Sequence, residues 1–216
     1  FKAGDESGFL DRLNKICVEA AAAINEGYTF IILSDRGVSR DYAALPALLA
    51  VGAVHHYLIR KALRTQTGII VESADAREVH HFALLFGYGA DCINPYLAYE
   101  AIQYLISDGQ LNLEYEAALR NYLKAAHTGI LKIISKMGIS TLRSYRGAQI
   151  FEALGLDEIV IEKCFSGTVS RIGGAGLNEI AKETILRHKQ AYPGSGLELA
   201  HLITGGVYQW KRDGEF

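Results

Sequence analysis

The feature that most constrains the fold of this 216-residue chain is an alternation of strand-forming runs and helix-forming segments. The apolar runs Tyr28–Leu33, Gly68–Val71 and Ala90–Ile93 favour buried strands. Between them, apolar residues recur every three or four positions, which is typical of helices. Alternation at this spacing predicts parallel βαβ units with helices on both faces of a sheet. We therefore expect an α/β fold.

Capping residues and glycine or proline stops locate the expected helices. Asp75 and Glu78 have the spacing of a capping box. Residues 129–134 either continue the helix that begins near Leu113 or form a short strand. Residues 158–164 are strand-prone, and the glycine-rich residues 167–176 are expected to form a loop. The expected helices span residues 8–26, 46–63, 76–86, 96–106, 113 to at least 126, 141–154 and 177–192, with a short one near 197–203.

Composition and charge exclude several classes of function. The formal net charge is −2 and the basic residues form no stripe, which argues against nucleic acid and anionic membranes as partners. The longest apolar run, Tyr42–Val54, is shorter than the roughly 20 residues that cross a bilayer. Cys17, Cys92 and Cys164 lie too far apart for a metal or redox motif. We expect buried thiols and a reducing, cytoplasmic location.

The ends and the middle of the chain suggest how it is organised. The chain begins with Phe1 and its only methionine is Met137, so we interpret it as a piece of something longer. The polar segment Ser107–Gln110 is the best candidate for a boundary. We therefore expect two parts, residues 1–110 and residues 111–216.

A glycine turn is the first candidate binding segment. Its residues, Lys136, Met137, Gly138, Ile139 and Ser140, follow a strand-prone run and precede an expected helix. Backbone N–H groups at the start of a helix bind anions, Gly138 would allow close approach, and Ser140 would cap the helix or bind a ligand. A simple turn without a ligand stays the alternative, because a lone glycine turn is weak evidence.

The glycine-rich segment 167–176 is the second candidate. Thr168, Ser170 and Arg171 stand among four glycines just before an expected helix. Hydroxyl groups and a planar guanidinium suit a phosphate or a carboxylate. The segment has neither the Gly-Lys-Ser/Thr of a P-loop nor the glycine spacing of a dinucleotide fingerprint. A flexible structural loop is the other interpretation.

Other polar groups favour structural roles. The pairs His55-His56 and His80-His81 cannot each chelate a metal on a helix, because neighbouring residues point about 100° apart. We expect core or interface histidines. The segment Ser34–Arg36 ends a strand and is either a site or, more simply, a local ion pair. No catalytic triad can be assembled from a known signature.

Several long motifs resemble the large chain of glutamate synthases. Those that resemble the central domain of the family are Ile32–Arg36, Leu45–His56 and Glu78–Ala98. Those that resemble the beginning of its FMN-binding synthase domain are Lys136–Leu156, Gly167–Gly174 and Tyr208–Glu215. The resemblance implies that residues 1–110 are part of the central domain and that residues 111–216 are the N-terminal part of the FMN-binding domain.

The resemblance also implies a fold and a chemistry. The family condenses glutamine-derived ammonia with 2-oxoglutarate, and electrons pass from a 3Fe-4S cluster to FMN. It implies a partial or degenerate (β/α)-barrel of the FMN-linked type. Partners would be the rest of the synthase chain and an electron-donor subunit or ferredoxin. FMN contacts would fall on the backbone of residues 136–140 and, less directly, on Thr168, Ser170 and Arg171.

The sequence departs from the family in what it omits. It has no amino-terminal cysteine nucleophile, no cysteine trio for the cluster and few of the barrel strands. We therefore expect the isolated chain to lack synthase activity, to bind FMN weakly or not at all, and to self-associate through open strand edges. The two glycine-rich segments are expected to face a common pocket. The alternatives are a non-enzymatic scaffold or 2-oxoglutarate-binding module and, less favoured, an unrelated nucleotide-binding enzyme.

Overall fold

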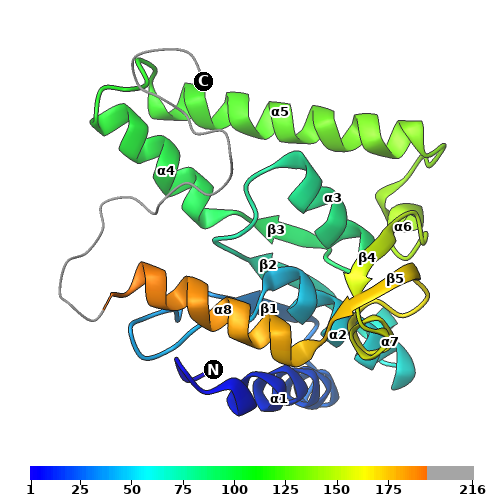
Figure 1. The fold of residues 1–216 in the computed structure, drawn as a ribbon. Coiled ribbons are helices and arrows are strands. Elements are labelled where there is room, and N and C mark those ends of the chain that lie inside the picture. Colours follow the sequence, from blue (N-terminus) through cyan, green and yellow to red (C-terminus); the bar gives the residue numbers. More distant parts are fainter. Residues whose placement is uncertain (194–216) are drawn as a thin grey trace.

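A computed structural model describes residues 1–193 of the chain (Figure 1). The expected helix near 197–203 and the motif Tyr208–Glu215 lie outside the described residues. The elements, in chain order, are α1 Glu6–Asn25, β1 Phe30–Ser34, α2 Ala47–Arg60, a 3₁₀ turn Arg64–Gln66, β2 Gly68–Glu72, α3 Val79–Gly87, β3 Cys92–Asn94, α4 Tyr96–Ser107, α5 Tyr115–Lys136, α6 Leu142–Tyr145, β4 Glu152–Leu156, α7 Glu158–Cys164, β5 Val169–Ala175 and α8 Leu177–Ala191.

The strands form two separate parallel sheets. One sheet has the order β1-β2-β3, and the other pairs β4 with β5 around the intervening α7. Helices α4 and α5 lie on one side of the larger sheet and α1 lies on the other (Figure 1). The expected parallel α/β architecture is confirmed, and the sheets of the described residues do not close into a barrel. Strand β1 is an edge strand with Phe30 and Ile32 exposed, and self-association through it stays a prediction.

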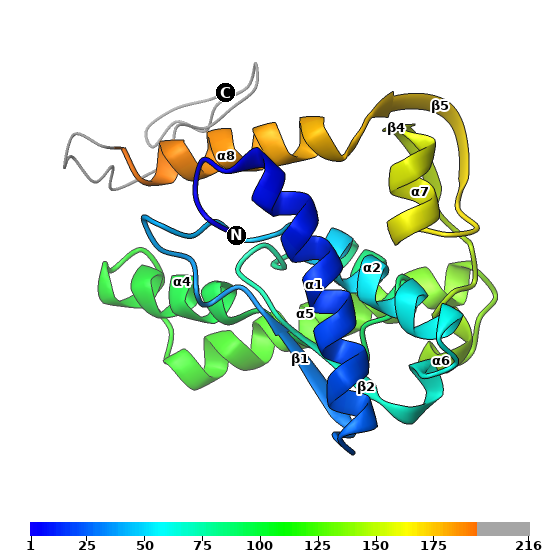
Figure 2. The ribbon, with the colours of Figure 1, turned by 90° about the horizontal axis from the view of Figure 1, so that it is seen from below.

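The core is built around α2, which is apolar on nearly every side. Helix α1 buries one stripe against it, beginning with Phe9, Leu13 and Cys17, and the Asp5 carboxylate caps α1 by accepting the N–H of Gly8 at 3.0 Å. Figure 2 shows α1 crossing in front of β1 and α2, with α8 lying across its beginning. The later part of the chain joins the same core, to which α7, the residue after it and α8 contribute Val160, Ile161, Cys164, Phe165 and Ala181.

Helices α2 and α7 are in close contact at Gly52. A Cβ atom at this position would overlap the backbone carbonyl oxygen of Cys164 and would lie 3.1 Å from the ring of Phe165. The absence of a side chain at Gly52 therefore sets how near α7 can pack to the central helix.

The prediction of a helix over residues 141–154 is wrong. Only α6, a single turn, is helical, because the backbone becomes extended at Arg146 and is left-handed at Gly147 and Gln149, where φ is +70° and +53°. The N–H of Gly147 instead donates to the carbonyl oxygen of Gly87 at 2.9 Å. The apolar residues that follow enter strand β4.

The two predictions that follow it in the chain are also wrong. Residues 158–164 form helix α7, since Asp157 caps its start by accepting the N–H of Ile159 at 2.9 Å and the helix buries Val160 and Cys164. Residues 169–175, expected as loop, form strand β5. Gly174 allows β5 to pass so near β4 that a Cβ there would overlap the carbonyl oxygen of Gly155.

Other expectations have mixed outcomes. Residues 129–134 continue α5, and the helix expected at 177–192 is confirmed as α8.

Helix α3 begins three residues later than expected, with a capping box between Glu78 and His81 rather than Asp75 and Glu78. Cys92 is exposed, contrary to expectation, because it lies on the short edge strand β3. Within residues 1–193, no helix has the length and apolar character needed to cross a membrane.

Candidate functional site

The turn 136–140 ends a helix and does not follow a strand. Lys136 is the last residue of α5, and Gly138 adopts the left-handed conformation with φ +69°, which is typical of a helix C-terminus. The N–H groups of Met137, Gly138 and Ile139 donate to carbonyl oxygens of α5 at 3.0–3.1 Å. The expected free N–H groups are therefore used within the helix end. Thr141, not Ser140, caps the short α6.

The second predicted segment is spread along β5. Thr168, which precedes the strand, forms a 2.8 Å hydrogen bond with the hydroxyl of Tyr88. Arg171 is 80% exposed and lies 3.6 Å from a carboxylate oxygen of Glu152 on β4. The hydroxyl of Ser170 donates to the carbonyl of Ile172 at 3.4 Å. Among the described residues, no hydrogen bond or ion pair joins this segment to residues 136–140.

A polar cluster lies at the carboxyl ends of β1, β2 and β3, the edge at which parallel α/β folds place ligands. Its centre is Glu72, whose carboxylate accepts from the Ser34 hydroxyl at 2.6 Å, from Arg36 Nε at 2.7 Å and from Asn94 Nδ2 at 3.2 Å. The Ser34 hydroxyl and the Arg36 guanidinium lower the pKa of Glu72. The expected local ion pair within Ser34–Arg36 is not found, because Arg36 pairs with Glu72 of the next strand and not with its neighbour Asp35.

Asp35 belongs to the same cluster. Its carboxylate accepts the Tyr96 hydroxyl at 2.7 Å and the N–H of Ala74 at 2.8 Å. The Arg36 guanidinium stacks 3.9 Å from the centre of the Tyr96 ring. Burial, followed by the bond to Asp35, raises the pKa of Tyr96. The cluster thus ties the ends of all three strands to the start of α4.

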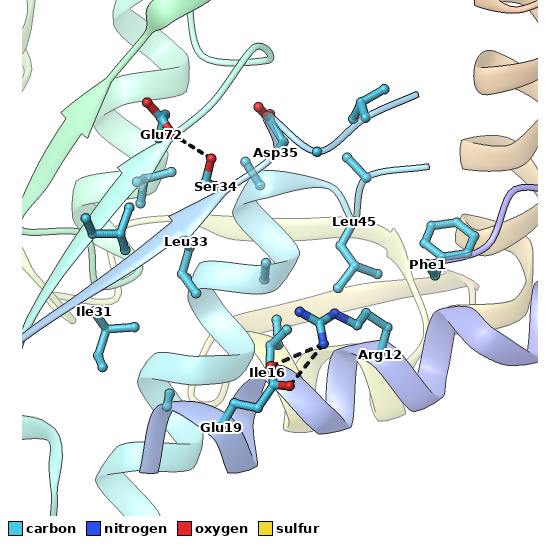
Figure 3. A pocket seen from close by; sticks show the side chains of 18 of the residues that line it. Phe1, Arg12, Ile16, Glu19, Ile31, Leu33, Ser34, Asp35, Leu45 and Glu72 are labelled. Carbon is cyan, nitrogen blue, oxygen red and sulfur yellow. Dashed lines mark hydrogen bonds and ion pairs between the residues drawn. The ribbon is translucent and has the colours of Figure 1, made fainter. Parts of the chain in front are cut away.

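The polar cluster adjoins a cavity of about 800 Å³, which we call the β1 cavity (Figure 3). Its walls are mainly apolar side chains of α1, β1 and the segment before α2, among them Ile16, Ile31, Leu33 and Leu45. Ser34, Asp35 and Glu72 stand together at one end, and the Arg12–Glu19 ion pair lies at another place on its wall (Figure 3). The cavity has room for a sizeable ligand or a chain segment.

A second, partly buried network was not predicted. Arg64 donates to His55 Nδ1 at 2.9 Å, to the carbonyls of Thr67 and Gly89 at 2.7 Å, and to the Asp91 carboxylate at 2.8 Å. Asp91 also pairs with Arg146, and it accepts the N–H of Ile69 at 2.8 Å. The members come from distant parts of the chain and form no motif, so no local signal could have found them.

Beside this network lies a smaller cavity of about 270 Å³, which we call the histidine cavity. It is lined by His55 and His56 of α2, by the end of α3, by Tyr145 and the residues after it, and by the segment before β5. Thr168 is the one residue of the two predicted binding segments on its wall.

Three of the four paired histidines, His55, His80 and His81, make structural contacts, as expected. The ring of His81 accepts backbone N–H groups at 3.3 Å in the α3 capping box, and His80 packs edge-on against Phe151. Burial lowers the pKa of His55 to about 3 and that of His56 to about 4. In residues 1–193, no group of three or more histidine, cysteine or acidic side chains is arranged to hold a metal ion.

Because of His55, the free energy of unfolding is expected to decrease as the pH is lowered from 6.5. The unfolded chain binds a proton at this residue near pH 6.5, whereas the folded chain does so only near pH 3, so the stabilisation is complete above pH 6.5 and is lost as the pH falls. Between pH 6.5 and pH 5, the contribution of His55 to the free energy of unfolding decreases by about 2 kcal/mol. Urea unfolding of the wild type and of His55→Asn checks this, since the variant should lose less on acidification; equal losses would contradict it.

These features define the class: a parallel α/β protein with two open sheets, a polar cluster at the carboxyl ends of its strands and a mainly apolar cavity beside it. The family model described as glutamate synthase central domain matches residues 1–157. The chain belongs to the glutamate synthase family.

Relatives with described activities agree with this assignment. The chain is 49% identical over 203 residues to the "Glutamate synthase [NADPH] large chain" of Bacillus subtilis, a match that covers 94% of this chain and 13% of that one. It is 49% identical to the "Glutamate synthase [NADH]" of Schizosaccharomyces pombe, over 89% of this chain and 9% of that one. The chain therefore spans about a tenth of the length of these relatives. A mutant flavocytochrome b2 with pyruvate bound has 12% identity and a TM-score of 0.48, over 74% of this chain and 40% of that one.

Proposed function

We propose that this chain acts as part of a glutamate synthase that transfers the amide nitrogen of glutamine to 2-oxoglutarate and reduces the product to glutamate. The observation that carries the proposal is the 49% identity to the Bacillus subtilis large chain over nearly the whole chain. In this proposal, residues 1–110 belong to the central domain and residues 111–216 begin the FMN-binding domain. The two parallel sheets are part of a degenerate (β/α)-barrel completed by the rest of the synthase.

FMN is the proposed cofactor of that parent enzyme, where it would supply hydride chemistry. The side chains of the predicted segments suit its polar groups, since Lys136 and Ser140 are exposed and Arg171 is 80% exposed. The backbone of the turn suits it less well, because the N–H groups of residues 137–139 already bind carbonyl oxygens of α5. We therefore infer that contact with the flavin would come from side chains. The 3Fe-4S cluster would be held by other parts of the parent enzyme, and electrons would come from a separate electron-donor subunit or from ferredoxin.

A chimera tests the proposal. The aligned segment of the Bacillus subtilis large chain is replaced by residues 1–216, and glutamate formation from glutamine and 2-oxoglutarate is measured with the FMN content. We expect activity within about tenfold of the parent, because relatives at this identity keep the same core packing and differ mainly by tolerated substitutions. Substituting Ser170→Ala and Arg171→Ala together should lower FMN content.

The matched control carries the corresponding segment of the Schizosaccharomyces pombe relative, which is 49% identical to this chain. If that chimera is active and the chimera with residues 1–216 is folded but inactive, the proposed function is wrong. Unchanged FMN content in the double variant would remove Ser170 and Arg171 from the proposed flavin contacts.

A further inference from the structure

The histidine cavity carries polar groups that have no partner in the described residues. The Tyr145 side chain is fully buried and its hydroxyl makes no hydrogen bond. His56 Nε2 is also buried without a partner, and both residues line the cavity. Buried polar groups are nearly always hydrogen-bonded, so unpaired ones beside a cavity point to a missing ligand atom.

The neighbouring ring of His55 adds a hydrogen-bond donor. Arg64 Nε donates to His55 Nδ1 at 2.9 Å, so Nδ1 acts as the acceptor and the proton of the neutral ring lies on Nε2. No hydrogen bond from this Nε2–H is found among residues 1–193. The rings of His55 and His56 stand with their centres 5.0 Å apart. The hydroxyl of Tyr145 and the Nε2–H of His55 are therefore donors that meet no acceptor among the described residues.

The charges beside the cavity favour an anion. Arg64 and Arg146 share the single carboxylate of Asp91, which leaves one positive charge without a partner in that network. Arg146 Nε is buried and unpaired. Donors of this kind bind a charged acceptor more strongly than a neutral one. The volume of about 270 Å³ admits a molecule of a few carbon atoms and excludes a nucleotide.

We propose that the histidine cavity binds a small carboxylate, whose oxygens accept hydrogen bonds from the Tyr145 hydroxyl and from His55 Nε2–H, with His56 completing the site. The Tyr88–Thr168 hydroxyl pair and the Gln149 side chain form its polar wall. The proposal rests on the contacts of this cavity and not on the proposed synthase activity.

Acetate serves as the probe and acetamide as its neutral counterpart of the same shape. The thermal unfolding midpoint of the isolated chain is measured at pH 7 against each compound, at constant ionic strength. We expect a saturable rise with acetate and a smaller one with acetamide, since a ligand that binds only the folded state stabilises it. Tyr145→Phe removes only the hydroxyl and should weaken the effect of acetate at least tenfold, which corresponds to about 1.4 kcal/mol.

The control variant is Tyr104→Phe, at an exposed position on α4, which should respond to acetate as the wild type does. Without acetate, Tyr145→Phe should be at least as stable as the wild type, because an unpaired buried hydroxyl has been removed. A non-saturating rise shared by all three proteins overturns the proposal. An equal response to acetamide overturns the choice of a carboxylate, and a large loss of stability in Tyr145→Phe alone shows that the hydroxyl has a structural partner instead.

Discussion

Replacing Asp91 by alanine is expected to destabilise the fold by about 3 kcal/mol, because it leaves two guanidinium groups near each other with no carboxylate between them. The carboxylate also accepts the N–H of Ile69 on β2, so the change removes a bond to the sheet. Burial acts to raise the pKa of Asp91, but the Ile69 N–H and the arginines outweigh it and lower the pKa. We place the effect at the lower end of the range for buried pairs because the Asp91 side chain is 30% exposed.

Urea unfolding at pH 7 measures this loss, and Glu183→Ala is its control. Glu183 pairs with Arg187 at 2.6 Å on the outer face of α8, where both side chains are more than 60% exposed. Removing an exposed pair should change stability by less than about 0.5 kcal/mol. Similar losses in the two variants would mean that the Arg64–Asp91–Arg146 network contributes no more than a surface contact.

Replacing Gly52 by alanine is expected to destabilise the fold by about 2 kcal/mol, although helix propensity alone predicts a gain of about 1 kcal/mol for the same change. The added Cβ would overlap the backbone carbonyl of Cys164, and backbone atoms cannot rotate away as the end of a flexible side chain can. Helix α7 must then move off α2, which opens the core between them.

Close packing predicts a loss of stability for Gly52→Ala, whereas helix propensity predicts a gain, so the sign of the change decides between them. Differential scanning calorimetry and urea unfolding measure this change. Gly37→Ala is the control, since a Cβ at this exposed glycine would meet no atom within 4 Å and its φ is not in the left-handed region. It should leave stability within about 0.5 kcal/mol of the wild type. A stabilised Gly52→Ala variant would show that α2 and α7 are not in close contact.

The fold of the first half could be predicted well because its signals are local. Apolar residues such as Leu13 and Cys17 recur at helical spacing, and runs such as Gly68–Val71 are short, apolar and strand-forming. In the second half of the chain, the predicted secondary structure was wrong where local preference and tertiary packing favour different structures. The β-branched residues of 159–161 favour a strand, but the Asp157 cap and the burial of Val160 against α2 make them helical.

The candidate site was harder to predict, since its members meet only after folding. Ser34 and Arg36 were visible at a strand end, but Glu72 lies on the neighbouring strand and nothing near it in sequence identifies it as their partner. The turn at Gly138 was misjudged because a glycine in the left-handed conformation ends helices and begins loops alike, and the preceding apolar residues suited either structure.

The core around α1 and α2 is completed by residues that lie late in the chain. The family match stops at residue 157, yet Val160, Cys164 and Ala181, which pack against α1 and α2, come later. At about 5–20 residues per second, a ribosome needs on the order of seconds to deliver them. During that interval the apolar side of α2 near Gly52 is not yet covered by α7, so this part of the core is completed only after most of the chain has been synthesised.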